Sequence, residues 1–380
     1  MLNKPLRVLH IHGDLIAGGG QTLSREWLRA SDKSVIDPYV VVLSAPLTLK
    51  ESFISAGVKV KVISGNRILQ IIKTAYFIVQ NHIDIVHTQS EPDRKVGHWA
   101  ALLTRRKVIA HLHSEWVYFA KPNPSNNLIS KLRSWVTYAI RKISERSVVK
   151  FIATSDLVKN EFQKYTTKPI ETIEPGIAII DVTDSIKKKY RDLLGCSDNE
   201  TVIVNLSRID PVKNLSDFVK VFSKLHDKNQ VKGFIAGEGS LRSEIENEIS
   251  SLTLNEDLQL LNALDDPMQL LGAADIFLAT STYESFGISV LEALGAGLVV
   301  IGYDLDVYSR YGDAVIRVPL GDNEALVREC QRVINDKSFY EKQKQLGIQA
   351  ACNYDIALGA KRLSEIDEFE LKCKERKKTK

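Results

Sequence analysis

Two carboxylates separated by seven residues mark the part of the chain best suited to hold a ligand. Glu284 and Glu292 lie within residues 280–301, a run that is otherwise small and apolar. The pattern predicts a helix from Gly287 through Leu294, and a carboxylate on so apolar a helix is costly unless it is paired or hydrogen-bonded. The start of this helix, where backbone amides lack partners, is suited to an anion. Ligand hydroxyls beside a phosphate are therefore one candidate for what these residues bind.

A basic loop precedes the carboxylates. The segment SRIDPVKN, residues 207–214, places Arg208 and Lys213 directly after a predicted core strand. A guanidinium fork and an ammonium point charge can together hold phosphate oxygens. Asp210 and Pro211 are expected only to set the turn. A surface Arg and Lys in an ordinary turn is the alternative, and the glutamate pair further along the chain weighs against it.

Two glycine turns follow other predicted strands. Gly237 and Gly239 lie in AGEGS after the strand expected at 231–236, and Gly18 and Gly19 end the loop GDLIAGGG after the first strand. Glycines let the backbone come close to a ligand. The N-terminal loop is neither G-x-G-x-x-G nor a P-loop. Alone it also fits a tight strand-to-helix connection.

The order and spacing of Arg208-x4-Lys213, Gly237-x-Gly239 and Glu284-x7-Glu292 resemble the signature of the retaining GT-B glycosyltransferases of glycosyltransferase family 4. The resemblance implies an α/β fold with two Rossmann-like, doubly wound domains facing across a cleft. It also implies transfer of a hexose, without metal or cofactor, from a UDP- or GDP-linked nucleotide sugar. The acceptor would be lipid-linked or a surface polysaccharide.

The resemblance also assigns roles to residues. Glu284, His113 and Arg208 form the expected catalytic set, with Glu284 facing the donor sugar, His113 near the reacting carbon and Arg208 aiding departure of the leaving group. The donor diphosphate is expected to meet Arg208, Lys213, Gly18, Gly19, Phe286, Gly287 and Ile288. The ribose is expected to meet Glu292, and the nucleotide to lie near Gly237, Gly239 and Leu264.

Several positions depart from the family pattern. Tyr303–Val307 replaces a Gly-Gly-x-x-Glu element that lines the donor pocket, so the donor stays open. His113 has a second interpretation, as a hydrogen-bonded histidine at a strand end. Together with His111 and Glu115 it could suggest a metal site, but a fourth ligand is lacking and no metal is expected.

Strand and helix patterns alternate along the whole chain, which predicts parallel sheets covered by helices. Pro175 and Gly176 suggest a domain boundary. We expect an N-terminal acceptor-side domain at 1–176, a nucleotide-sugar domain at 177–360, and a helix with a basic tail at 361–380 that packs back on the first domain. The expected strands are 7–12, 39–43, 58–63, 84–87, 107–111, 151–154, 171–174, 201–207, 231–236, 258–261, 275–280, 298–301 and 315–318.

Charge is distributed unevenly over the 380 residues. Residues 1–180 hold 25 basic and 14 acidic side chains, whereas the whole chain has a net charge of +4. This asymmetry suggests an anionic partner for the first domain, or uneven surface charge without one. Residues 126–150 fit a basic amphipathic helix that rests on anionic lipid, or an ordinary helix packed by its apolar face. Basic residues without an aromatic stacking platform do not predict nucleic-acid binding.

The remaining composition indicates a cytoplasmic protein that can attach to the inner face of a membrane. The four cysteines show no metal-ligand spacing and are expected to be reduced thiols. Two functions compete with sugar transfer. A sugar-nucleotide epimerase shares the two-domain layout, and a non-catalytic, glycan-binding partner subunit keeps the fold.

Overall fold

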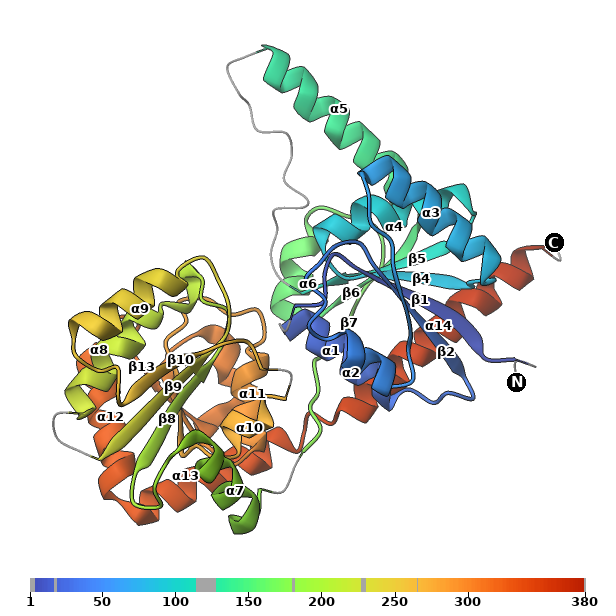
Figure 1. Cartoon of the computed structure of the whole chain (residues 1–380). Helices are drawn as coiled ribbons and strands as arrows, with labels where there is room; N and C mark the ends of the chain where they lie inside the picture. Colours follow the sequence, from blue (N-terminus) through green and yellow to red (C-terminus); the bar gives the residue numbers. More distant parts are fainter. Residues whose placement is uncertain are drawn as a thin grey trace. The chain divides into compact units, whose positions relative to one another are not determined.

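The computed structural model describes residues 4–16, 19–113, 128–179, 182–226, 230–264 and 266–378. The chain divides into two compact units (Figure 1). Unit 1 comprises residues 1–16, 20–176 and 356–380, and unit 2 comprises residues 177–355 with the short segment 17–19. Each unit is an α/β layer structure with its own parallel sheet.

Unit 1 is built on a seven-stranded sheet of order β3-β2-β1-β4-β5-β6-β7. Its strands are β1 Leu6–His12, β2 Ile36–Val42, β3 Lys59–Val62, β4 Ile85–Thr88, β5 Lys107–Leu112, β6 Val148–Ala153 and β7 Ile170–Thr172. Its helices are α1 Gly19–Ala30, α2 Lys50–Ser55, α3 Arg67–Gln80, α4 Glu91–Leu103, α5 Leu128–Ser144, α6 Asp156–Gln163 and α14 Ile356–Lys378, with a short turn η1 Glu145–Ser147. The last helix, α14, thus belongs to the unit that begins the chain.

Unit 2 has a six-stranded sheet of order β10-β9-β8-β11-β12-β13. Its strands are β8 Thr201–Leu206, β9 Val231–Ala236, β10 Leu258–Leu261, β11 Ile276–Ala279, β12 Val299–Tyr303 and β13 Val315–Val318. Its helices are α7 Asp184–Leu194, α8 Leu215–His226, α9 Arg242–Ser251, α10 Met268–Leu271, α11 Ile288–Gly295, α12 Asn323–Asn335 and α13 Lys337–Ala351, with turns η2 Pro211–Lys213 and η3 Asp306–Ala314.

All strand pairs in both sheets are parallel, so the predicted doubly wound α/β class is confirmed. Every residue of β4, β11 and β12 is buried, as expected when helices cover both faces. In each sheet the winding direction reverses once, between β1 and β4 and between β8 and β11. Ligands of such sheets bind beyond the carboxyl ends of the strands at this reversal.

One prediction about a segment was wrong. The basic helix expected at 126–150 ends at Ser144, because Glu145–Ser147 forms a 3-10 turn and Val148 already begins β6. The helical spacing of the basic residues had concealed the β-branched start of that strand. The helix α7, which Thr183 caps and Gly195 ends in a left-handed conformation, lies in a charged stretch for which no helix or strand was expected.

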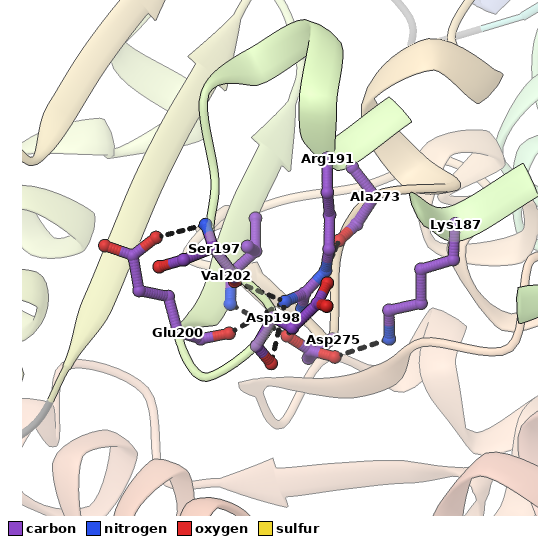
Figure 2. Close-up of polar contacts among 8 residues, drawn as sticks. All are labelled: Lys187, Arg191, Ser197, Asp198, Glu200, Val202, Ala273 and Asp275. Atoms are coloured by element: carbon purple, nitrogen blue, oxygen red, sulfur yellow. Dashed lines mark hydrogen bonds and ion pairs between the residues drawn. The ribbon is translucent and has the colours of Figure 1, made fainter. Parts of the chain in front are cut away.

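A buried arginine fastens α7 to the sheet of unit 2 (Figure 2). The Arg191 guanidinium donates to the carbonyls of Ser197, Glu200 and Ala273 at 3.0–3.1 Å and pairs with Asp275 at 2.6 Å. Asp275 also pairs with Lys187 at 2.6 Å. A hollow of about 540 Å³ lies beside these groups, at the amino ends of β8 and β11. Because Arg191, Lys187 and Asp275 in its lining hold α7 to the sheet, we interpret this edge of the sheet as structural.

Candidate functional site

The predicted phosphate loop and the predicted carboxylate loop meet at the winding reversal of unit 2. The first follows β8 and the second follows β11, which are neighbours in the sheet. The Thr282 amide donates to the Val212 carbonyl at 2.9 Å, and the Thr280 hydroxyl donates to the Lys213 carbonyl at 3.0 Å. The two loops therefore form one edge with a fixed relative position.

Lys213 and Glu284 form an ion pair at this edge. Lys213 Nζ lies 2.6 Å from Glu284 Oε1, and the side chains are only 15% and 13% exposed. The Ser281 hydroxyl donates to the same carboxylate oxygen at 2.8 Å. The sequence placed both charged residues near a ligand but did not predict that they pair. A pair this sheltered from water is worth more than a surface pair, and it leaves the local charge near neutral.

Arg208 is held differently. Its side chain is 64% exposed, and its Nη1 lies 2.8 Å from Asp210 Oδ2. The prediction that Asp210 only sets the turn was incomplete, because this carboxylate also orients the guanidinium. An exposed pair of this kind contributes little to stability, so Arg208 can exchange Asp210 for another anion.

The start of α11 lies directly after Glu284. Gly287 caps the helix in a left-handed conformation with φ 79°, and the first turn carries no acidic residue. A Cβ on Gly287 would lie 2.9 Å from Cε1 of the buried Tyr308 ring, so the turn requires glycine. Phe286 is buried in the core beneath the helix. The amides of 286–288 thus begin a helix whose positive end is not neutralised in its own first turn.

The other predicted nucleotide-side residues surround this helix or support the Arg208 loop. Glu292 lies one turn along α11 and is partly buried. Leu264 packs against the core cluster that contains Phe286. Gly237 and Gly239 pack against the Arg208 loop, because Cβ atoms there would lie 1.8 Å from the Ser207 carbonyl oxygen and 2.3 Å from the Ile209 carbonyl oxygen. The close approach that these glycines allow is to the protein's own backbone.

Unit 1 holds His113 within a buried layer of polar rings. His10, His87 and His111 come from the adjacent strands β1, β4 and β5, and all are at most 1% exposed. The His10 and His87 rings stack at 4.5 Å, and His111 lies parallel to His113 at 5.9 Å. The sequence singled out His111 and His113 but missed the other members of this layer.

Hydrogen bonds connect the layer at both ends. His87 bonds through Nδ1 to His111 Nε2 and through Nε2 to Asp367 Oδ1 of α14, both at 2.8 Å. Gln89 joins His113 Nε2 at 2.7 Å to His10 Nδ1 at 3.1 Å. The signal in the sequence is alternation, because His10 and His12, His87 and Gln89, and His111 and His113 each fall two residues apart on strands.

Burial favours the neutral form of His10, His111 and His113. It lowers the pKa of His113 to about 4, with a further contribution from Arg94, and it lowers the pKa of His111 well below the usual value. With the Gln89 carbonyl oxygen as its partner, His113 donates from Nε2 and keeps Nδ1 as an acceptor. Its ring lies 3.7 Å from the position of a Cβ on Gly20, in the first turn of α1. His113 therefore adjoins the helix that follows the N-terminal glycine loop.

Of that loop, Gly19 is the first residue of α1, and Gly18 lies outside the described residues, as does Glu115. Among the residues with described positions, no group of three or more His, Cys, Asp or Glu side chains has an arrangement that could hold a metal ion. The described cysteines Cys196, Cys330 and Cys352 are free thiols.

Comparison with known proteins gives matches in both halves of the chain. Residues 17–204 match the family model "Glycosyltransferase Family 4", and residues 186–351 match "Glycosyl transferases group 1". Together these two regions cover the chain from residue 17 to residue 351. They include every residue predicted to bind a donor.

Curated relatives and solved structures agree with these matches. The chain is 27% identical over 234 residues to alpha-monoglucosyldiacylglycerol synthase of Streptococcus pneumoniae, covering 59% of this chain and about half, 52%, of that protein. It is 24% identical over 278 residues to N-acetyl-alpha-D-glucosaminyl L-malate synthase of Bacillus anthracis, covering 70% of each. The Anabaena HepE structure in complex with UDP-glucose superposes with a TM-score of 0.78 at 19% identity, covering 95% of this chain and 99% of HepE.

Proposed function

Because the chain belongs to the GT-B glycosyltransferases of the family 4 and group 1 type, we propose that it transfers a hexose from a UDP-linked donor to a lipid-linked acceptor. The configuration at the anomeric carbon is retained. The HepE complex with UDP-glucose favours the uridine nucleotide, and a GDP-linked sugar is the alternative that the donor test distinguishes.

One observation carries the proposal. Lys213, Glu284 and the start of α11 lie on one edge of unit 2, at the point where a doubly wound sheet binds ligands. A cation and a helix start attract a diphosphate, and the adjacent carboxylate accepts hydrogen bonds from sugar hydroxyls. Glu292, one turn along α11, meets the ribose hydroxyls. Glu284 would thus contact the sugar, Lys213 and the helix start the diphosphate, and Glu292 the ribose.

The chemical step breaks the bond between the anomeric carbon and the diphosphate oxygen and forms a bond to an acceptor oxygen on the same face of the sugar. The acceptor's hydroxyl proton passes to the departing phosphate oxygen. Arg208, Lys213 and the amides of 286–288 stabilise the negative charge that develops on this leaving group. Side-chain cations perform this role in the proposal, so activity persists in the presence of a metal chelator. His113, as a neutral acceptor, orients the donor sugar.

The proposed acceptor rests on the surface of unit 1 as well as on the relatives. The S. pneumoniae relative is named for a diacylglycerol glycolipid. In unit 1, α3 exposes Ile68, Ile72 and Tyr76 to 72%, 57% and 67%. These residues share one face of the helix because they recur every four positions. An exposed apolar row of this length on a water-soluble surface indicates an interaction.

The helix α5 exposes a second apolar row. Trp135, Val136, Ile140 and Ile143 are 40–60% exposed, so these apolar side chains are not buried within unit 1. Both α3 and α5 lie beside α4 (Figure 1). None of the helices in the described part of the chain combines the length and hydropathy that a membrane crossing requires. We propose that the two rows rest on an anionic membrane surface, with exposed basic residues such as Arg67 and Lys73 beside them.

The function is tested by titrating UDP- and GDP-linked hexoses into the full chain by calorimetry, followed by transfer assays with lipid-linked acceptors and with L-malate. We expect a UDP-hexose to bind, and Lys213→Ala to weaken it at least tenfold because a nearly buried phosphate contact is lost. Lys224→Ala is the matched control, since Lys224 pairs with Glu324 on the surface of the same unit. Release of an epimerised nucleotide sugar without acceptor would identify an epimerase instead. Binding without any turnover would identify a partner subunit.

Membrane attachment is tested by sedimentation with vesicles of phosphatidylglycerol and of phosphatidylcholine. We expect binding to the anionic vesicles and a large loss in Ile68→Ser/Ile72→Ser. Leu193→Ser is the control, because Leu193 is similarly exposed, at 68%, but lies on α7 of unit 2. Equal binding of both variants would contradict the assignment of this face.

A further inference from the structure

We propose that Asp367, carried by α14, is a positioning residue for His113. The inference rests on the proposed function, in which His113 orients the donor sugar. It adds a residue that lies more than 250 positions away in the sequence from the group it acts on. Asp367 touches no predicted ligand group itself, so any effect it has on transfer must pass through the histidine layer.

Two routes of contact lead from Asp367 to His113. In the first, Asp367 bonds to His87, His87 bonds to His111, and the His111 ring lies parallel to His113. In the second, His10 stacks on His87, and Gln89 connects His10 to His113. Both routes pass through the His87 ring, whose orientation is therefore the point that Asp367 controls.

The carboxylate directs the hydrogen bonds of His87 and His111. A carboxylate only accepts, so His87 Nε2 donates to Asp367. In a neutral His87 ring Nδ1 then accepts, and His111 Nε2 must donate to it. At the other end the Gln89 amide has one donating and one accepting end, so the tautomers of His10 and His113 are set together. Ring stacking joins the two hydrogen-bonded chains, so Asp367 acts on the His113–Gln89 bond through the positions of the His87 and His111 rings.

Packing alone does not account for Asp367. The residue is 2% exposed, and burying a carboxylate in a largely apolar interior is costly. Apolar residues of similar size at such places are often neutral or stabilising. The surrounding contacts also bring α14 close, because a Cβ on Gly359 would lie 2.6 Å from Trp27 Nε1. A close-packed helix that nevertheless buries a carboxylate against His87 is explained by control of the ring.

The test compares Asp367→Ala and Asp367→Asn with Glu370→Gln. Glu370 is the control because it also lies on α14 but pairs with Lys107, at 3.2 Å, outside the histidine layer. Histidine labelled with ¹⁵N reports the tautomer of His113 directly, and the chain has only 8 histidines to assign. Steady-state kinetics with a UDP-hexose donor, measured well below the melting temperature, separate kcat from KM.

We expect Asp367→Ala to convert the His113 signals from a single Nε2-protonated form to a mixture, and to lower kcat about tenfold with donor KM changed less than twofold. Asp367→Asn keeps an acceptor and should lower kcat about threefold, whereas Glu370→Gln should change neither readout. Wild-type His113 signals together with wild-type kcat in both Asp367 variants would overturn the proposal, even if the melting temperature falls. If the alanine variant does not fold, the asparagine variant alone decides by the same two readouts. If the wild-type chain transfers no sugar, the proposed function fails, while the NMR comparison still decides whether Asp367 controls His113.

Discussion

The two units present their candidate functional groups in opposite electrostatic states. In unit 2, Lys213 and Glu284 are charged and paired, and Arg208 is charged and exposed. In unit 1, burial favours the neutral form of His113 and of the neighbouring His10 and His111. Charged groups suit the phosphates of a donor, and neutral acceptors suit hydroxyl groups. In the proposed function, unit 2 therefore binds the nucleotide and unit 1 orients the reacting groups.

The units also differ in how their groups are held. The groups of unit 2 lie on two loops that follow neighbouring strands and are joined by hydrogen bonds to backbone carbonyls. Those of unit 1 depend on side chains from three strands and from α14. Changes in unit 2 should therefore act locally on binding, whereas changes in unit 1 should spread through the layer.

The largest effect is expected for Lys213→Ala. Loss of the nearly buried cation removes charge stabilisation of the leaving diphosphate, so kcat/KM should fall at least about 100-fold. The measurement is transfer of labelled hexose, with Lys224→Ala expected to remain within twofold of wild type. A comparable loss in both variants would mean that general surface charge, rather than this edge of unit 2, is responsible.

A second large effect concerns the Arg208 loop. Gly237→Ala places a Cβ 1.8 Å from the Ser207 carbonyl oxygen, and we expect it to lower the free energy of unfolding of unit 2 by about 3 kcal/mol. Gly321→Ala is the control, since φ is +83° there but no heavy atom lies within 4 Å of the added Cβ, and backbone strain alone should cost about 1 kcal/mol. Circular dichroism in urea measures the difference. Equal effects of the two substitutions would show that the loop adapts.

The strand and helix alternation was sufficient to predict the fold, because both sheets are fully parallel and repeat one local unit. The end of α5 was not predicted, because basic residues at helical spacing ran on into β6, and α7 was not predicted, because its stretch reads mainly as a polar, charged connection. Arg208 and Lys213 could be placed after β8 from spacing alone. Their different partners, Asp210 and Glu284, depend on loop geometry that spacing does not specify.

The histidine layer was predictable from the sequence only in part. His-x-His twice and His-x-Gln once, each on a predicted strand, indicate one polar face at adjacent strand ends, and this signal was available in the sequence. The contribution of Asp367 was not, because it requires α14 to return to unit 1 in one particular register. Contacts between residues so far apart follow from tertiary packing.

Lowering the pH should reduce the stability of unit 1 before that of unit 2. Burial lowers the pKa of His12 and of His98 to about 3, so the unfolded chain binds more protons than the folded chain below about pH 6.5, and the free energy of unfolding falls as pH falls. Each of the two should cost about 2 kcal/mol at pH 5 relative to pH 7. Asp93, whose pKa burial raises to about 6, acts in the opposite direction as a single group.

The tryptophans make this measurable. All four lie before residue 177, so their fluorescence reports unit 1. Between pH 7 and pH 5, the free energy of unfolding of unit 1, measured by fluorescence in urea, should fall more than that of unit 2, measured by hydrogen exchange. Equal shifts in the two units would contradict the neutral state inferred for His12 and His98.

The smallest effect is expected for Asp210→Asn. Because Arg208 is 64% exposed, its pair with Asp210 is weak, and freeing it should raise UDP affinity only about two- to threefold. The gain should disappear at high salt, which calorimetry at two ionic strengths would show. A gain that persists at high salt would indicate a rearranged loop.

In the proposed function, Glu284 neutralises Lys213 until the donor sugar binds. Calorimetric titration of Glu284→Gln with UDP and with UDP-glucose tests it most directly. Since Lys213 loses its 2.6 Å partner, UDP should bind about three- to fivefold more tightly, while UDP-glucose, deprived of charge-assisted hydrogen bonds, should bind about tenfold more weakly. Opposite changes for the two ligands support the account. Two affinities that stay unchanged, or that shift together in one direction, would contradict it.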